Sequence, residues 1–373
     1  MKIAGQGIIM STENVRTYNE RIRRSRPESP WTAEREGSGI LNIYDIARIA
    51  GVSIATVSRV LNGSDKVSDK TRRRVLEVME QEKFVPAALS RSRGMYAPSL
   101  VGIVCPDVAD EYMARSVACL EKELKAYGYD CMLYCSGYGQ REKEETVRKV
   151  LRKRIAALIL VGSNYAGDQN HEGDTGYLAR ASGKVPVFLI NGYVEGAEIY
   201  CVMADDYRAV YEVTAGLADS GCRKIAFLCD TRSASGLQKQ KGYEDALRDR
   251  GLPVRGERKL YMENRVEAVR DLLLVRQDLD FDSVVASEDI LAIGVLKYAK
   301  IRGLQVPEEL SVVGYNNSQA SICCEPELTS VDSRQQVLCR LTVEHMIRRL
   351  NGEEVPHCQK VACRLVKRST MEF

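Results

Sequence analysis

The sequence has few of the residues that metal sites usually need. Only three histidines occur among the 373 residues, and the twelve cysteines include no Cys-x-x-Cys pair. We therefore expect no zinc site, because structural zinc is held by four Cys or His side chains at short spacings. The cysteines mostly lie inside apolar runs such as GIVCPD and AFLCD, and none precedes Cys105. This pattern is typical of reduced cysteines that serve as small core residues.

Several patterns that mark enzymes and membrane proteins are absent as well. The sequence contains no P-loop, no Gly-x-Gly-x-x-Gly fingerprint, and no catalytic grouping of Ser, His and Asp or of two glutamates. No stretch approaches the roughly 20 apolar residues that span a bilayer. The first residues are too polar after Met10 for a secretory signal. These absences predict a cytoplasmic protein that is not an enzyme, has no cofactor and does not bind a membrane.

Positive charge is concentrated near the N-terminus. The net charge is +3, but residues 40–96 hold ten Lys and Arg against six acids. Residues 1–39 have a balance of +2, and the rest of the chain has a balance of −3. A small basic module on a nearly neutral body indicates a polyanionic partner for that module.

Three short helices are predicted within this basic segment. Their expected bounds are Ile43–Ala50, Ile54–Leu61 and Asp69 to about Glu82. Each follows a residue that can cap a helix, namely Asn42, Ser53 and Ser68. Helices of this length bury little area alone, so we expect them to pack into one compact three-helix unit.

The second of these helices has the size and the side chains of a DNA-reading element. A helix over Ile54–Leu61 is short enough to enter a major groove about 12 Å wide. Its outward side chains are Ile54, Ala55, Thr56, Ser58 and Arg59. Hydroxyls near a helix N-terminus suit phosphate oxygens, and an arginine can bind a guanine edge with two hydrogen bonds. A generic helical bundle with an exposed arginine is the alternative interpretation.

From residue 99 onward, strand-like apolar runs alternate with amphipathic segments. SLVGIVCPD, IAALILVGS and VPVFLING belong to a first series, and KIAFLCD, SVVASED and LSVVGYNN to a second. Continuous apolar runs are typical of parallel strands buried on both faces. Two successive series of this kind predict two doubly wound lobes. A ligand cleft is then expected between them, at the carboxyl ends of the strands.

The run DIARIAGVSIATVSRVLN, followed by VSDKTR, resembles the DNA-binding headpiece of the LacI/GalR family of lactose repressor-like transcriptional regulators. The resemblance continues through PVFLING, KGYEDAL, SEDILAIGVL and PELTSV and covers about residues 40–370. It implies an all-α helix-turn-helix headpiece joined to an α/β body that resembles periplasmic binding proteins, with two doubly wound parallel-sheet lobes. It also implies a homodimeric, nucleoid-associated regulator, expected to be a repressor, on near-palindromic double-stranded operator DNA.

The resemblance assigns DNA contacts by motif position. Ile54, Ala55 and Arg59 would read bases. Phosphates would be held by Tyr44, Ser53, Thr56, Ser58, Asn62, Lys66, Ser68 and Thr71. The implied organisation has four parts: an atypical or disordered extension at 1–39, the headpiece at 40–84, a hinge at 85–98, and an effector-binding and dimerisation domain at 99–373. Without leucine heptads at its end, the chain is expected to be a dimer and not a tetramer.

One departure from the family pattern lies in the hinge. Where relatives insert a leucine into the minor groove, this chain has Arg93. An apolar wedge unstacks a base step, whereas a guanidinium favours a narrow, electronegative groove. We therefore expect weaker DNA bending and an A/T-rich operator centre. The alternative is that Arg93 only contacts phosphate.

Other departures lie in the cleft, where the resemblance places Tyr112, Asn191, Lys239, Asp289 and Asn316. Lys239 replaces the usual arginine, and Asn191 and Asn316 replace common aspartates. Fewer carboxylates beside a retained lysine favour an anionic effector such as a sugar phosphate or sugar acid. A neutral sugar is the alternative, and Asp289 could instead cap a helix beginning at Ile290.

Two further possibilities stay open at this stage. A sugar-binding transport protein without DNA function would explain the two lobes but not the headpiece. A phosphocarrier protein acts as corepressor for some relatives, so it is a candidate partner here.

Overall fold

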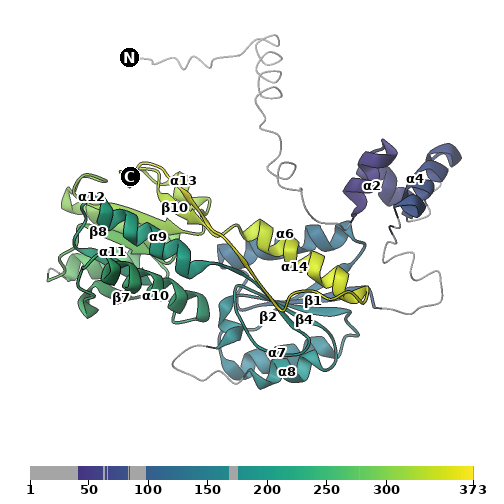
Figure 1. Cartoon of the computed structure of the whole chain (residues 1–373), viewed down its shortest axis with the longest axis horizontal. Helices are drawn as coiled ribbons and strands as arrows, with labels where there is room; N and C mark the ends of the chain where they lie inside the picture. Colours follow the sequence, from purple (N-terminus) through teal and green to yellow (C-terminus); the bar gives the residue numbers. More distant parts are fainter. Residues whose placement is uncertain are drawn as a thin grey trace, which may run out of the picture. The chain divides into compact units, whose positions relative to one another are not determined.

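The computed structural model describes residues 41–61, 64, 66–82, 84, 98–167, 175–276 and 278–372 (Figure 1). Residues 1–39, Asn62, Arg93 and all of the predicted hinge except residue 98 therefore lie outside the described residues, and the predictions for them stay untested. None of the helices in the described ranges is long and apolar enough to cross a membrane.

The N-terminal unit consists of three helices, as the capping pattern predicted. They are α2 (Ile43–Ala50), α3 (Ile54–Leu61) and α4 (Asp69–Gln81). Asn42 begins α2 with a reciprocal capping box, in which its side chain accepts from the backbone of Asp45 and Asp45 accepts from the backbone of Asn42. Gly51 ends α2 with φ of 66°, a left-handed conformation that glycine adopts without strain.

Two serines begin the other helices of this unit. Ser53 Oγ accepts from the backbone N–H of Thr56 at 3.2 Å, and Ser68 Oγ accepts from that of Thr71 at 3.3 Å. The guanidinium of Arg72 donates to the carbonyl of Ser64 at 2.6 Å, which ties the α3–α4 connection to α4. The buried residues that hold the three helices together are Ile43, Ile46, Ala47, Ala50, Val57, Val60, Val75, Val78 and Met79.

The body contains two six-stranded sheets of matching strand order. In the N-terminal lobe the order is β11-β5-β4-β3-β1-β2, and all of the pairings are parallel. These strands are β1 (Leu100–Cys105), β2 (Asp130–Cys135), β3 (Ala157–Val161), β4 (Val187–Ile190), β5 (Ile199–Ala204) and β11 (Cys358–Val361). The sheet is covered by α6 (Glu111–Ala126) and α14 (Gln335–Leu350) and by α7 (Gln140–Leu151) and α8 (Gly176–Ser182).

The C-terminal lobe repeats this plan with the order β12-β10-β9-β8-β6-β7. Its strands are β6 (Ile225–Cys229), β7 (Lys259–Tyr261), β8 (Ser283–Ala286), β9 (Ser311–Tyr315), β10 (Thr329–Asp332) and the antiparallel β12 (Arg364–Val366). Its helices are α9 (Asp206–Asp219), α10 (Ala234–Asp249), α11 (Val266–Val275), α12 (Asp289–Arg302) and α13 (Ala320–Cys323). The two lobes confirm the doubly wound fold predicted from the apolar runs.

Three chain crossings connect the lobes. They lie between β5 and α9, between β10 and α14, and between β11 and β12. Because α14 packs on α6 and on the N-terminal sheet, a helix late in the sequence completes the first lobe (Figure 1). Crossings of this kind allow one lobe to move against the other while each core stays intact.

The close packing of α9 on α10 depends on Gly242. A Cβ at this position would lie 2.3 Å from the carbonyl oxygen of Tyr207 and 3.0 Å from the backbone nitrogen of Tyr211. We expect Gly242→Ala to destabilise the body by about 1–3 kcal/mol, since backbone atoms cannot yield as a side chain can. Urea denaturation followed by circular dichroism measures this. Gly256→Ala, whose Cβ would meet no atom within 4 Å, is the control, and equal midpoints for the two variants would contradict the prediction.

Candidate functional site

The exposed face of α3 carries the side chains expected to read DNA. Val57 and Val60 point into the three-helix core, whereas Ala55 and Arg59 are exposed and Ile54 is 40% exposed. No acid lies in the first turn of α3, and Arg59 lies in its last turn. The N-terminus of α3 therefore presents backbone N–H groups and hydroxyls without a competing carboxylate, which suits a phosphate or a base edge.

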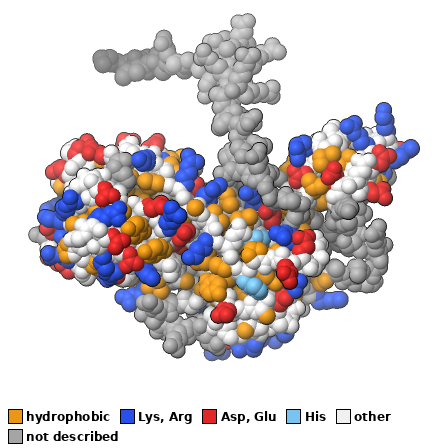
Figure 2. Space-filling view, viewed as in Figure 1, with side chains coloured by type: hydrophobic (Ala, Val, Ile, Leu, Met, Phe, Trp, Pro, Cys, Tyr) orange, Lys and Arg blue, Asp and Glu red, His pale blue; other side chains and the backbone are white. Residues whose placement is uncertain are grey.

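Most of the residues expected to hold phosphate lie near the N-terminal ends of α3 and α4. Ser53, Lys66 and Ser68 are exposed. Tyr44, Thr56, Ser58 and Thr71 are partly exposed, and the Oγ1 atoms of Thr56 and Thr71 each lie 2.9 Å from the hydroxyl of the serine that caps their helix. On the described surface shown in Figure 2, Lys and Arg side chains of the body are interspersed with Asp and Glu. Positive charge is therefore not gathered on that face of the body.

A cavity of about 300 Å³ lies between the two sheets at the carboxyl ends of their strands. From the N-terminal lobe it is lined by Asp110, Tyr112, Met113, Tyr138, Gly162, Ser163, Asn164 and Asn191. From the C-terminal lobe it is lined by Asp230, Thr231, Ser233, Ser235, Gly236, Lys239, Asn264, Ser287, Glu288 and Asn316. Nearly all of these side chains are polar, which suits a small hydroxyl-rich molecule better than an apolar one.

Four of the five predicted cleft residues line this cavity: Tyr112, Asn191, Lys239 and Asn316. Asn191 has a left-handed backbone, with φ of 66°, and its Oδ1 accepts from the backbone N–H of Ala204 at 3.2 Å. The side-chain amide of Asn316 donates to Glu288 Oε2 at 2.6 Å. The structure therefore brings these residues together, although they come from both lobes.

Asp289 lines an adjoining cavity of about 50 Å³ and not the larger one. Its carboxylate accepts from the backbone N–H of Ser318 and from the hydroxyl of Ser330, both at 2.6 Å. The alternative that Asp289 caps a helix beginning at Ile290 is wrong. Helix α12 begins at Asp289 itself, with Glu288 at the capping position and no side-chain cap. Asp289 thus positions the loop after β9.

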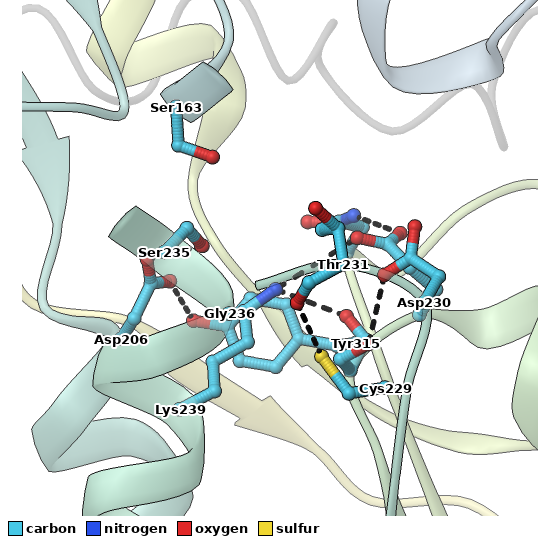
Figure 3. A network of polar contacts seen from close by, with 12 residues as sticks. Ser163, Asp206, Cys229, Asp230, Thr231, Ser235, Gly236, Lys239 and Tyr315 are labelled. Atoms are coloured by element: carbon cyan, nitrogen blue, oxygen red, sulfur yellow. Dashed lines mark hydrogen bonds and ion pairs between the residues drawn. The ribbon is translucent and has the colours of Figure 1, made fainter. Parts of the chain in front are cut away.

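Lys239 is held by the protein on several sides. Its side chain is only 5% exposed, and Nζ donates to the carbonyl of Ser287 at 2.9 Å. Nζ also lies 3.8 Å from Glu288 Oε1 and 3.7 Å from the centre of the Tyr315 ring (Figure 3). Against burial, which favours the neutral amine, the carboxylates of Glu288 and Asp206 raise the pKa of Lys239. Lys239 is therefore charged. Burial also raises the pKa of Glu288 well above its usual value, and the Lys239 ammonium opposes that rise.

A buried hydrogen-bond network holds the Tyr315 ring against which Lys239 lies. Asp206 is 2% exposed and accepts from the hydroxyls of Tyr315 at 2.5 Å and Ser235 at 2.6 Å (Figure 3). The network joins the first turn of α9, the first turn of α10 and the end of β9. It fixes the Tyr315 ring on which the Lys239 ammonium lies.

Three acids of the cleft, Asp110, Asp230 and Glu288, were not among the site residues predicted from the sequence. The signal was present, because each follows an apolar strand run, in VGIVCPDVAD, AFLCD and SVVASED. Their presence weakens the case for an anionic effector. That case needed a free positive charge at Lys239, and the Lys239 ammonium already lies 3.8 Å from the Glu288 carboxyl. Of the two interpretations, the described charges favour the neutral sugar over the anion.

Comparisons with known proteins place both parts of the chain. Residues 42–87 match the family described as bacterial regulatory proteins of the lacI family, and residues 214–371 match the periplasmic binding protein-like domain. An HTH-type transcriptional regulator of Lachnoclostridium phytofermentans is 40% identical over 89% of this chain and all of its own length. The chain belongs to the LacI family of bacterial regulatory proteins.

Further relatives agree with this membership. Catabolite control protein A of Priestia megaterium is 30% identical over 84% of this chain and 94% of its own length. The Lac repressor dimer bound to operator superposes with a TM-score of 0.68 at 22% identity, over 88% of this chain and 98% of that chain, and shows the same fold. The LacI resemblance, the fold class and the function as a DNA-binding transcriptional regulator are confirmed. The alternative of a transport protein without DNA function is not supported.

Proposed function

We propose that this LacI-family regulator acts as a homodimer in which each α3 enters the major groove of one half-site of a near-palindromic operator. Arg59 is the chief base reader, with Ile54 and Ala55 against neighbouring base edges. Phosphates are held by the hydroxyls of Ser53, Thr56 and Ser68 and by Lys66. The observation that carries the proposal is the exposed, acid-free face of α3 above a core made by Val57 and Val60.

The proposed effector is a small sugar-like molecule in the cavity between the lobes. One protein of similar fold is a CelR–cellobiose complex, and another is a Lac repressor bound to ONPG. The polar lining and the volume of about 300 Å³ fit a ligand of this size. Because the ligand contacts both lobes, it stabilises one relative orientation of them. Operator affinity then depends on the ligand, as coupling between two sites requires.

Measurement of DNA binding over a range of salt concentrations tests the proposal. Fluorescence anisotropy with promoter DNA of the gene itself is expected to show tight specific binding, with a log–log salt slope of roughly −5 to −10. Lys66→Ala is expected to reduce the slope by about one unit per headpiece, because it removes one phosphate contact. Arg48→Ala, at an exposed position of α2, is the control. Absence of promoter-specific retention by the wild-type protein would contradict the proposal.

The hinge prediction can be tested by DNA bending. We propose that Arg93 lies in a narrow minor groove and bends DNA less than a leucine wedge does. Arg93→Leu is then expected to increase the bend measured by circular-permutation gel shift, and to weaken the preference for an A/T-rich centre. A strong and equal bend with both proteins would refute this role. A phosphocarrier corepressor stays a prediction of the family resemblance.

A further inference from the structure

The cleft has a surplus of negative charge that Lys239 does not neutralise. Three acids, Asp110, Asp230 and Glu288, line the cavity with a single base, Lys239. Lys239 lies 3.8 Å from Glu288, where burial raises the pKa of the carboxyl and the ammonium opposes that rise. Asp110 and Asp230 remain, one from each lobe, and both line the cavity. Within the described ranges, neither carboxylate forms an ion pair with a Lys or Arg side chain. Asp110 Oδ1 accepts from the backbone N–H of Met113 at 3.0 Å, and Asp230 Oδ1 accepts from the Ser287 hydroxyl at 3.2 Å.

The charge of Asp230 acts on Asp110 across the cleft. Burial raises the pKa of Asp110, backbone N–H groups at the start of α6 oppose the rise, and the negative charge of Asp230 adds to it. Closing the lobes on a neutral ligand would remove both carboxylates from water without a compensating charge. That arrangement is unfavourable, because a buried ion without a partner loses its hydration.

Two further polar atoms in the cleft, Asn264 Oδ1 and the Tyr112 hydroxyl, are buried and have no hydrogen-bond partner among the described residues. Asn264 Oδ1 is an acceptor, like the carboxylates, whereas the Tyr112 hydroxyl can donate or accept. Most of these groups therefore need a hydrogen-bond donor from the ligand. A bare metal ion supplies no hydrogen-bond donor. The described residues include no group of three His, Cys, Asp or Glu that could hold one.

We propose that the effector is a sugar-sized molecule that carries a protonated amine, held between Asp110 of the N-terminal lobe and Asp230 of the C-terminal lobe. An ammonium group supplies three donors and one positive charge. Its bonds to both lobes stabilise the closed orientation of the cleft, and its hydroxyls meet the remaining polar side chains. This inference rests on the proposed function, because it names the chemical class of the effector for that site.

Isothermal titration of the full-length protein tests the inference. The probes are glucosamine, galactosamine and mannosamine, each compared with its neutral parent sugar, its N-acetyl derivative and its 6-phosphate. At least one free amine is expected to bind ten-fold or more tightly than its parent and its N-acetyl derivative. Failure of every amino sugar to bind, or equal binding of the neutral parent, overturns the inference.

Substitutions show whether the amine is bound through its charge or only through the shape it shares with the neutral sugar. Asp230→Asn is expected to weaken binding of the preferred amine at least ten-fold and that of its neutral parent less than three-fold. Asp271→Asn removes an exposed carboxylate of α11 that does not line the cavity and should leave both unchanged. Equal loss for amine and parent in Asp230→Asn would contradict an ion pair. Promoter binding by the wild type is measured in parallel, without sugar and with each sugar in turn. Its absence in every case would contradict the proposed function, whereas promoter binding together with binding of neutral sugars only would contradict this inference alone.

Discussion

Arg59→Ala is expected to abolish most of the sequence-specific DNA binding and to leave non-specific binding nearly unchanged. A well-placed arginine–guanine contact is worth about 1–3 kcal/mol of discrimination. A dimer carries the substitution twice, so the specific complex should lose about 2–6 kcal/mol, which is at least roughly 30-fold in affinity. Non-specific binding depends on phosphate contacts, which the substitution changes only slightly. Anisotropy titrations with promoter DNA and with a scrambled duplex measure both affinities.

The control for this experiment is Arg48→Ala. Arg48 lies on α2 with a side chain that is 76% exposed, and it forms an ion pair with Asp45 at 3.4 Å. Its removal takes away the same charge from the same three-helix unit, and the ion pair itself is worth little at the surface. If the two variants lose equal affinity for promoter and scrambled DNA, Arg59 acts only through its charge and the base-reading role is wrong.

Asp206→Ala is expected to be the most destabilising substitution in the body. The buried carboxylate accepts from Tyr315 and Ser235. Its removal leaves the Ser235 hydroxyl without this partner and the Tyr315 hydroxyl with only the weakly bonding Cys363 thiol at 3.4 Å. Each poorly satisfied group costs about 1–3 kcal/mol, so the C-terminal lobe should lose about 2–6 kcal/mol. The midpoint of urea denaturation is expected to fall accordingly. Ligand binding in the cleft should weaken as well, because Tyr315 and Lys239 lose their support.

Asp219→Ala provides the matched control on the same helix. Asp219 lies at the last turn of α9, its side chain is 62% exposed, and it pairs with Arg250 at 3.1 Å. An exposed pair of this kind contributes about 0–1 kcal/mol. Similar midpoints for Asp206→Ala and Asp219→Ala would mean that the network beneath the cleft does not stabilise the lobe.

The local structure of the headpiece could be predicted from the sequence because its signals are local. Asn42, Ser53 and Ser68 begin helices at the expected residues, and Gly51 ends one with a left-handed backbone. Each of these signals acts within about four residues along the chain. The parallel, doubly wound character of the lobes likewise followed from runs of apolar residues that are buried on both faces, whereas the strand order came only from the structure.

The electrostatics of the cleft could not be predicted in the same way. Lys239 and Glu288 are far apart in the sequence, and only the fold brings them within 3.8 Å. Without that distance, Lys239 looked like a free cation that would attract an anion. Asp289 was predicted to lie in the effector site, with a local capping role as the alternative. Its partners Ser318 and Ser330 follow about 30 and 40 residues later, so no local pattern could show that it holds the loop after β9.

The most direct test of the account asks which helix lies against the bases. A photo-reactive residue is placed at Ala55 of α3, and in a second protein at Glu80 of α4; both positions are exposed. After irradiation with promoter DNA, the account predicts crosslinks from position 55 to bases in the major groove of each half-site, and none from position 80. Crosslinks from position 80 alone, or specific DNA binding without crosslinks from position 55, would contradict the claim that α3 reads the operator.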